Sequence, residues 1–311
     1  MKRCIKRFIA GFSAIIMSVT TNSMVSALDN NSNMENHVEQ FIVASKDTNS
    51  GEITYKNFDT KLTTNARNNK VNELSTPAYQ GSISQEEEIS PNNVIGNDDR
   101  YRITHTTDFP YRTICRIVTY WDKDNDGVID NTMGIGTGFL EGPNAVVTAG
   151  HVIYDKNLNM WCEYAIITPA QDGAGSAPYG NTRSTIIHTS TAWIESGSAD
   201  QDWGLIETQS DIGNQVGWLG KFWTSGSLDG TSVHVTGYPG DKPQTMWRGN
   251  GSITKSESAR LFYNCDTMGA ESGAPVLNSS NQALAIHANG GSYNSGTRIT
   301  EWLFNFLEQF N

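Results

Sequence analysis

The stretch that decides the fold is Gly269-Ala270-Glu271-Ser272-Gly273-Ala274-Pro275-Val276. Small residues surround a single hydroxyl, and a short apolar run begins at the proline, as at the start of a strand. Small residues let the backbone approach a substrate closely, so that its N–H groups can bind a developing oxyanion. The stretch therefore predicts a nucleophile, Ser272, on a turn that leads into a strand.

A serine hydroxyl needs a base at neutral pH, and an imidazole with a pKa near ~6.5 suits that task. His151 ends the motif Thr-Ala-Gly-His at 148–151 and is the candidate base. Asp202 begins the run at 202–206 and is the candidate carboxylate that fixes the imidazole tautomer. The chain order of histidine, aspartate and serine is that of chymotrypsin, whereas subtilisin-type and α/β-hydrolase enzymes use other orders.

Short apolar or alternating runs recur around these motifs, separated by Gly, Asn, Asp and Pro, which predicts an all-β protein. We expect strands at 113–120, 138–140, 145–147, 164–167, 185–187, 203–206, 233–235, 275–277 and 283–286. Near the end, Trp302, Leu303, Phe306 and Leu307 recur at helical spacing behind Thr300. This predicts a C-terminal α-helix with Thr300 as its N-cap.

Charge and hydropathy exclude two classes of partner. The 311 residues carry a net charge of −11, which argues against nucleic acid. No apolar run reaches the roughly 20 residues that a membrane span needs. The first 27 residues combine a basic head, an apolar stretch at 8–19 and small residues at 25–27, which predicts a signal peptide and a secreted protein.

Residues 28–93 are polar and contain too little apolar surface to fold stably alone. We interpret them as a pro-segment, the alternative being a linker without a regulatory role, and place the protease domain at 94–311. Cys4 falls in the signal, so Cys115, Cys162 and Cys265 remain. Three is an odd number, and the chain can therefore form at most one internal disulfide, with the pair left open.

From residue 94 onward the sequence resembles the bacterial glutamyl endopeptidases, a secreted branch of the chymotrypsin-fold serine proteases. The matching stretches lie at 94–100, 148–151, 237–242 and 296–300. The resemblance implies two six-stranded antiparallel β-barrels with the active site between them. It also implies that His151 is the general base, that Asp202 orients it and that Ser272 attacks. The backbone N–H groups of Ala270 and Ser272 would form the oxyanion hole.

Specificity follows from the same resemblance, since the family cleaves after glutamate and less well after aspartate. Its pocket residues correspond to Thr267 and His287, whose hydroxyl and imidazole can donate hydrogen bonds to a carboxylate. The mature chain of the family begins near Val94, so cleavage after Asn93 would place a positive α-amine close to that pocket. Removal of the pro-segment would thus uncover the cleft and complete the pocket.

Ala270 and Glu271 depart from the family pattern, and Asp266 leaves a second specificity open. Ala270 stands where the fold usually has glycine, and its Cβ favours a flipped peptide that lacks one oxyanion donor, at a cost of roughly 10²–10³ in rate. A proteolytically weak homologue that acts as a binding module is therefore one alternative. Asp266 lies six positions before Ser272, which makes trypsin-like cleavage after Lys or Arg a second alternative. Glu271 replaces a neutral residue and is free to pair with a cation.

Residues 122–130 match the first nine positions of a calcium loop, with glycine at position 6. The ligands would be Asp122, Asp124, Asp126, the backbone of Val128, and Asp130. Position 12 is Met133 rather than glutamate, so a solvated acidic hairpin tip is the alternative. We expect no cofactor for catalysis, protein or peptide substrates, and a monomer.

Overall fold

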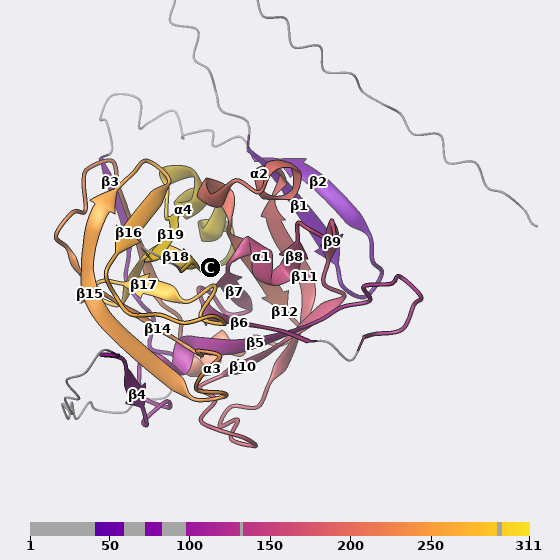
Figure 1. The fold of residues 1–311 in the computed structure, drawn as a ribbon, viewed down its shortest axis with the longest axis horizontal. Coiled ribbons are helices and arrows are strands. Elements are labelled where there is room, and N and C mark those ends of the chain that lie inside the picture. The colour runs from indigo at the N-terminus through magenta and orange to yellow at the C-terminus, as the bar shows by residue number, and fades with distance from the viewer. Residues whose placement is uncertain (1–40, 59–71, 83–97, 131–132, 291–293) are drawn as a thin grey trace, which may run out of the picture. The chain divides into compact units, whose positions relative to one another are not determined.

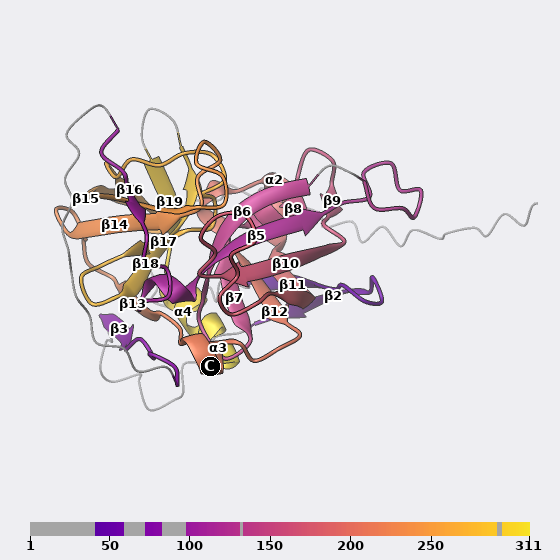
Figure 2. The ribbon, with the colours of Figure 1, turned by 90° about the horizontal axis from the view of Figure 1, so that it is seen from below.

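The structure, a computed structural model, describes residues 41–58, 72–82, 98–130, 133–290 and 294–311. The predicted signal peptide, Asn93 and Val94 lie outside the described residues. Figures 1 and 2 show two groups of strands that lie next to each other. The described elements are mostly strands, so the predicted all-β class is confirmed.

Six antiparallel strands close the first barrel, in the order β10-β5-β6-β7-β12-β11. Closure comes from the pairing of Ile166 and Ile167 on β10 with β11. Closing a sheet leaves few unpaired edges and surrounds a continuous apolar interior. The strands are β5 (Ile114–Tyr120), β6 (Met133–Leu140), β7 (Ala145–Thr148), β10 (Tyr164–Pro169), β11 (Thr182–Ser190) and β12 (Gly204–Thr208).

The second barrel repeats this plan in the order β17-β14-β15-β16-β19-β18, and β17 pairs with β18 to close it. Val235, Val276 and Ala285 are fully buried inside it. Both predicted six-stranded barrels are thus confirmed. The strands are β14 (Ser232–Gly237), β15 (Met246–Ser256), β16 (Arg260–Tyr263), β17 (Pro275–Leu277), β18 (Gln282–Asn289) and β19 (Asn294–Arg298).

The predicted C-terminal helix is confirmed as α4 (Glu301–Leu307). The Thr300 side chain accepts a hydrogen bond from the Leu303 N–H, so Thr300 is the N-cap. The Trp302 and Phe306 rings stack with centroids 5.4 Å apart, and the Phe306 ring lies 5.1 Å from that of Trp203. Because Trp203 directly follows Asp202, the helix supports the chain at this carboxylate.

The remaining elements are short and lie outside the barrels. They are β4 (Tyr101–Ile103), β8 (Tyr154–Asp155), β9 (Met160–Trp161), β13 (Gly220–Thr224), α1 (Gly150–Ile153), α2 (Thr191–Ser196), α3 (Gly213–Val216) and the 3₁₀ turns Tyr111–Thr113, Ala199–Gln201 and Glu308–Phe310. The β13 strand runs parallel to β18, whereas β4 pairs antiparallel with β15.

The described part of the polar segment 28–93 forms strands on the sheets of the protease domain. β1 (Ile42–Asp47) pairs with both β11 and β2 (Ile53–Asn57), and β3 (Glu73–Thr76) pairs with β13. Val43 and Ala44 are fully buried, and the Lys46 ammonium lies 3.0 Å from the Glu163 carboxylate. The host sheets supply the apolar surface that this segment lacks by itself.

The three cysteines are buried as free thiols, so the described residues contain no disulfide among Cys115, Cys162 and Cys265. The apolar core therefore carries the stability of the domain.

Among the described residues, no helix has the length and apolar character needed to cross a membrane.

Candidate active site

His151 and Asp202 are joined by two hydrogen bonds. His151 lies in the first turn of α1, directly after β7, and Asp202 lies just before β12, the neighbour of β7. The ring Nδ1 is 2.8 Å from Asp202 Oδ2, and the His151 backbone N–H donates to Oδ1 at 2.9 Å. The Asp202 side chain is only 3 % exposed. This carboxylate fixes both the ring and the backbone of His151.

The pKa of His151 is raised above its usual value. Burial lowers the pKa, but the charge of Asp202 and its hydrogen bond raise it by more. The neutral ring therefore carries its proton on Nδ1, facing Asp202, and leaves Nε2 as the proton acceptor. That is the tautomer that a general base needs.

Ser272 lies on a turn of the second barrel that the first barrel holds in place. The Thr137 N–H on β6 donates to the Ser272 carbonyl at 2.8 Å, and the Thr137 hydroxyl donates to the Ala270 carbonyl at 3.1 Å. Gly273 has φ 91°, and a Cβ there would lie 2.1 Å from the Thr137 carbonyl oxygen. Only glycine fits this position, which explains the Ser-Gly pair.

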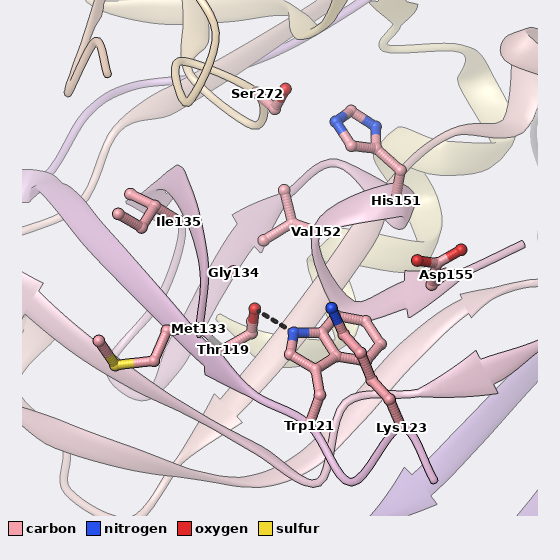
Figure 3. Close-up of a pocket in the computed structure, with 10 residues that line it drawn as sticks. All are labelled: Thr119, Trp121, Lys123, Met133, Gly134, Ile135, His151, Val152, Asp155 and Ser272. Carbon is pink, nitrogen blue, oxygen red and sulfur yellow. Dashed lines mark hydrogen bonds between the residues drawn. The ribbon is translucent and has the colours of Figure 1, made fainter. Parts of the chain in front are cut away.

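The Ser272 and His151 side chains line one pocket (Figure 3). The rest of its lining comes from the first barrel and its loops, namely Thr119, Trp121, Lys123, Met133, Gly134, Ile135, Val152 and Asp155. Among the described residues, no hydrogen bond reaches the Ser272 hydroxyl. Such bonds are often long in free enzymes and tighten when the substrate is bound.

Two backbone donors flank Ser272. Within the described residues, the N–H groups of Ala270 and Ser272 have no hydrogen-bond partner. Ala270 has φ 75°, the left-handed conformation that costs an L-residue roughly 1–2 kcal/mol. The Gly269 carbonyl accepts a hydrogen bond from the Gly240 N–H at 2.7 Å. Because a trans peptide points its C=O and N–H in opposite directions, the Ala270 N–H points away from Gly240.

His287 lies beneath the nucleophile turn. Its N–H donates to the Ala274 carbonyl, and its own carbonyl accepts from the Gly273 N–H. Its ring is 3 % exposed, and its Nδ1 lies 2.5 Å from the Tyr263 hydroxyl. Burial, and then the nearby His151, lower the pKa of His287 to about 3, so the ring is neutral. A hydroxyl that donates to Nδ1 leaves Nε2–H as a donor.

The two candidate specificity residues before the turn differ in their surroundings. Thr267 is half-buried. The Asp266 carboxylate is engaged by the segment at the start of the protease domain, because its Oδ2 accepts from the Asp99 N–H at 3.2 Å. Burial, and then the hydrogen bond and charge of Asp266, raise the pKa of the Asp99 carboxyl. Neither Thr267, Asp266 nor His287 lines the pocket of Figure 3.

The acidic loop at 122–130 brings three of its predicted ligands together. Carboxylate oxygens of Asp122, Asp124 and Asp126 lie within 4.8 Å of one another. Asp122 also accepts hydrogen bonds from two backbone N–H groups of the loop. The Asp130 carboxylate instead accepts from the Lys123 N–H at 2.7 Å. The charge of Asp126 raises the pKa of Asp124, as expected when like charges crowd together.

Thr137 and Tyr263 contribute to the site although the sequence patterns do not single them out. Thr137 comes from the first barrel, and Tyr263 lies nine residues before Ser272, so no spacing rule connects either to the nucleophile. Their role depends on tertiary contacts, which a single sequence does not display.

Comparisons with known proteins agree with this geometry. Residues 136–286 match a family model described as a trypsin-like peptidase domain. The chain is 40 % identical over 251 residues to a glutamyl endopeptidase of Bacillus licheniformis, which covers 76 % of this chain and 75 % of the relative. The chain belongs to the glutamyl endopeptidase family of serine proteases.

Two further relatives extend this result. The family fold recurs in a solved Glu endopeptidase complexed with MPD, at a TM-score of 0.60 and 27 % identity, covering 70 % of this chain and 98 % of that one. A Bacillus subtilis protein named extracellular metalloprotease is 38 % identical over 244 residues, 75 % of each chain. In this chain, the one cluster of metal-type ligands among the described residues is all-carboxylate, whereas catalytic zinc sites contain histidine.

Proposed function

We propose that this glutamyl endopeptidase homologue hydrolyses peptide bonds after glutamate, and less well after aspartate, through an acyl-enzyme on Ser272. The observation that carries the proposal is that two hydrogen bonds join His151 to Asp202, and that His151 lines the same pocket as Ser272. His151 Nε2 would take the serine proton as Oγ attacks the scissile carbonyl, and would then protonate the leaving amine. In the second step, His151 would take a proton from water, which attacks the acyl ester. The peptide acid would leave, and Ser272 would regain its proton from His151.

The oxyanion of the tetrahedral intermediate would be bound by the N–H groups of Ala270 and Ser272. Both are without a partner within the described residues, so neither must break a bond before it can donate. Donors that are already oriented stabilise developing charge without reorganisation.

For specificity, we propose that Thr267 and His287 bind the glutamate carboxylate of the substrate. A neutral His287 oriented by Tyr263 offers Nε2–H as a donor, and burial keeps the ring uncharged. Trypsin-like cleavage after Lys or Arg would need a free Asp266 carboxylate, which here accepts a hydrogen bond from Asp99. This contact favours cleavage after glutamate over cleavage after Lys or Arg.

Chromogenic peptides that differ only in a Glu, Asp, Lys or Arg before the scissile bond test the proposal. We expect the highest kcat/KM for Glu, a lower value for Asp and none for Lys or Arg. Ser272→Ala should lose activity, whereas Ser280→Ala, an exposed serine in the β17–β18 turn, should keep it. Preference for Lys or Arg would support the trypsin-like alternative. No cleavage and no labelling by a serine-directed phosphonate would support the binding module.

We also propose that residues 1–27 direct secretion and that 28–93 are a pro-segment cleaved after Asn93. The Bacillus subtilis relative is named extracellular metalloprotease, which supports export. The described pro-segment residues pair with the sheets of the protease domain and are not among the residues that line the pocket of Ser272. A mature chain with one extra residue before Val94 should lose glutamate preference. Unchanged kinetics would refute a role for the α-amine.

We further propose that the protein is a monomer, which size-exclusion chromatography should show.

A structural Ca²⁺ site at residues 122–130 is a further proposal. The convergence of the Asp122, Asp124 and Asp126 carboxylates supports it, whereas Asp130 is engaged with Lys123. Val128 would contribute its backbone carbonyl. Calorimetry with CaCl₂ on the mature protein should give a binding heat that Asp124→Asn weakens. The absence of heat and of a thermal shift would leave a solvated hairpin tip.

A further inference from the structure

The orientation of the Ala270 N–H depends on a hydrogen bond made one residue earlier. The Gly269 carbonyl accepts from the Gly240 N–H at 2.7 Å, and this bond fixes the plane of the peptide that carries the Ala270 N–H. The fixed plane matters because Ala270 has φ 75°, which an alanine does not favour. The position of Gly240 therefore sets the orientation of the Ala270 N–H, one of the two oxyanion donors.

Gly240 is held through its neighbour Asp241. The Arg100 guanidinium donates to both Asp241 oxygens, with Nη1–Oδ1 at 3.2 Å and Nη2–Oδ2 at 2.8 Å. A forked, charge-assisted pair of this kind fixes direction as well as distance. Arg100 is itself anchored by Asp98, whose carboxylate accepts from Nε and Nη2 at 2.9 Å each. The Arg100 side chain is 3 % exposed, whereas those of Asp98 and Asp241 are 46 % and 33 % exposed, so the guanidinium is the buried centre of this network.

A second contact joins Arg100 to the nucleophile turn. The Glu271 side chain is fully buried directly before Ser272, and its Oε2 lies 3.8 Å from Arg100 Nη1. The same Oε2 accepts from the Met268 N–H at 2.6 Å, while the Glu271 N–H donates to the Met268 carbonyl at 3.1 Å. These two bonds close the loop that contains Gly269 and Ala270. Among the described residues, Arg100 is the only ion-pair partner of Glu271.

We propose that Arg100 is a positioning residue for the oxyanion hole. It holds Gly240 through Asp241 and the Met268–Glu271 loop through Glu271, and both contacts aim the Ala270 N–H at the substrate. This inference rests on the proposed function. It also bears on Glu271: burial raises the pKa of this carboxyl to about 8, and the Met268 N–H and then the charge of Arg100 act against that rise. Arg100 does not line the pocket of Ser272, so we expect its effect in the transition state rather than in ground-state binding.

The test compares Arg100→Gln with Arg102→Gln, using the glutamate peptide as substrate. Arg102 lies two residues further along the chain, and its side chain is 45 % exposed and paired with Asp172, so it is a matched control. We expect Arg100→Gln to lower kcat at least about tenfold, toward the roughly 10²–10³-fold loss of a missing donor, with KM changed less than about threefold. Arg102→Gln should match the wild type.

An inhibitor pair separates positioning from general damage. A peptide aldehyde ending in glutamate forms a tetrahedral adduct with Ser272 that uses the oxyanion hole, whereas the matching peptide acid binds as a product. Arg100→Gln should weaken the aldehyde by the same factor as kcat and leave the acid unchanged. Equal weakening of both ligands, or a kcat equal to that of Arg102→Gln, would overturn the proposal.

Two variants cover the case in which Arg100→Gln does not fold. Arg100→Lys keeps the charge near Glu271 but cannot form the fork, and should recover part of kcat. Asp241→Asn, whose side chain is one-third exposed, weakens only the arm to Gly240 and should lower kcat with KM unchanged. If the single variants Asp241→Asn and Arg100→Lys both kept the kcat of the wild type, the proposal would be refuted. If the wild type and Arg102→Gln both failed to cleave the glutamate peptide, the proposed function itself would be refuted.

Discussion

The nucleophile turn at 268–276 and the acidic loop at 122–130 use the same local devices. Each contains a glycine with positive φ, 91° at Gly273 and 85° at Gly127. In each, a carboxylate accepts backbone N–H groups of its own loop, Glu271 from Met268 and Asp122 from Gly127. From sequence, both are recognisable motifs for a site.

Their surroundings differ. The nucleophile turn is held by Thr137 from the other barrel, by Gly240 and by the backbone of His287. The acidic loop is stabilised mainly by bonds among its own residues, and nothing lies within 4 Å of where a Cβ of Gly127 would stand. The nucleophile turn is thus fixed by residues that are distant in sequence. The conformation of the acidic loop rests on its own hydrogen bonds and on the proposed cation.

The largest difference should come from replacing the two glycines. Gly273→Ala would place its Cβ 2.1 Å from the Thr137 carbonyl oxygen and 2.2 Å from the Thr148 hydroxyl. The turn must then move, and we expect a loss of at least ~10²-fold in kcat/KM, because small misplacements of reacting groups are that costly. Gly127→Ala meets open space, so it should cost only the roughly 1–2 kcal/mol of a left-handed alanine and leave activity within about twofold.

Peptide kinetics and thermal unfolding of the two variants measure this contrast. Comparable activity losses in both would contradict the view that the surrounding fold, rather than the local turn, fixes the nucleophile.

The pH dependence of cleavage should report on His151 at the nucleophile site. The pKa of His151 is raised, so the free base is lost as pH falls through a value above ~6.5. We expect kcat/KM to fall about tenfold per pH unit below that point. His287, with its pKa lowered to about 3, does not contribute to this limb, and neither do ordinary carboxylates near ~4. An acid limb near pH 4 would mean that a carboxylate controls activity instead.

The smallest effect should come from Ala270→Gly. Relief of the left-handed conformation gains roughly 1–2 kcal/mol, offset by ~0.4–1 kcal/mol of added chain entropy in the unfolded state. Because the Gly269 carbonyl is already bonded to Gly240, we expect a rise of a few degrees in Tm and kcat changed less than about threefold. A large rise in kcat would show instead that Ala270 keeps the peptide flipped, as the sequence alone suggested.

Much of the fold was predictable because its signals are local. The runs at 145–147 and 275–277 became β7 and β17 within one residue at each end, and Thr300 caps α4 as predicted. The pairing of His151 with Asp202 also followed from chain order and chemistry. The role of Glu271 did not, because its cation is Arg100, which lies 171 positions away in sequence and reaches it only in the folded chain.

The sequence by itself determined the class of protein, the candidate triad of His151, Asp202 and Ser272, and the C-terminal helix. Motif chemistry and short-range periodicity are enough for these. Only the tertiary structure decided that the polar residues 41–58 and 72–82 form strands, because the edges of β11 and β13 provide the partners that this segment lacks. It also decided how the Ala270 N–H is aimed, because Gly240, Asp241 and Arg100 are distant in sequence and come together only in the folded chain.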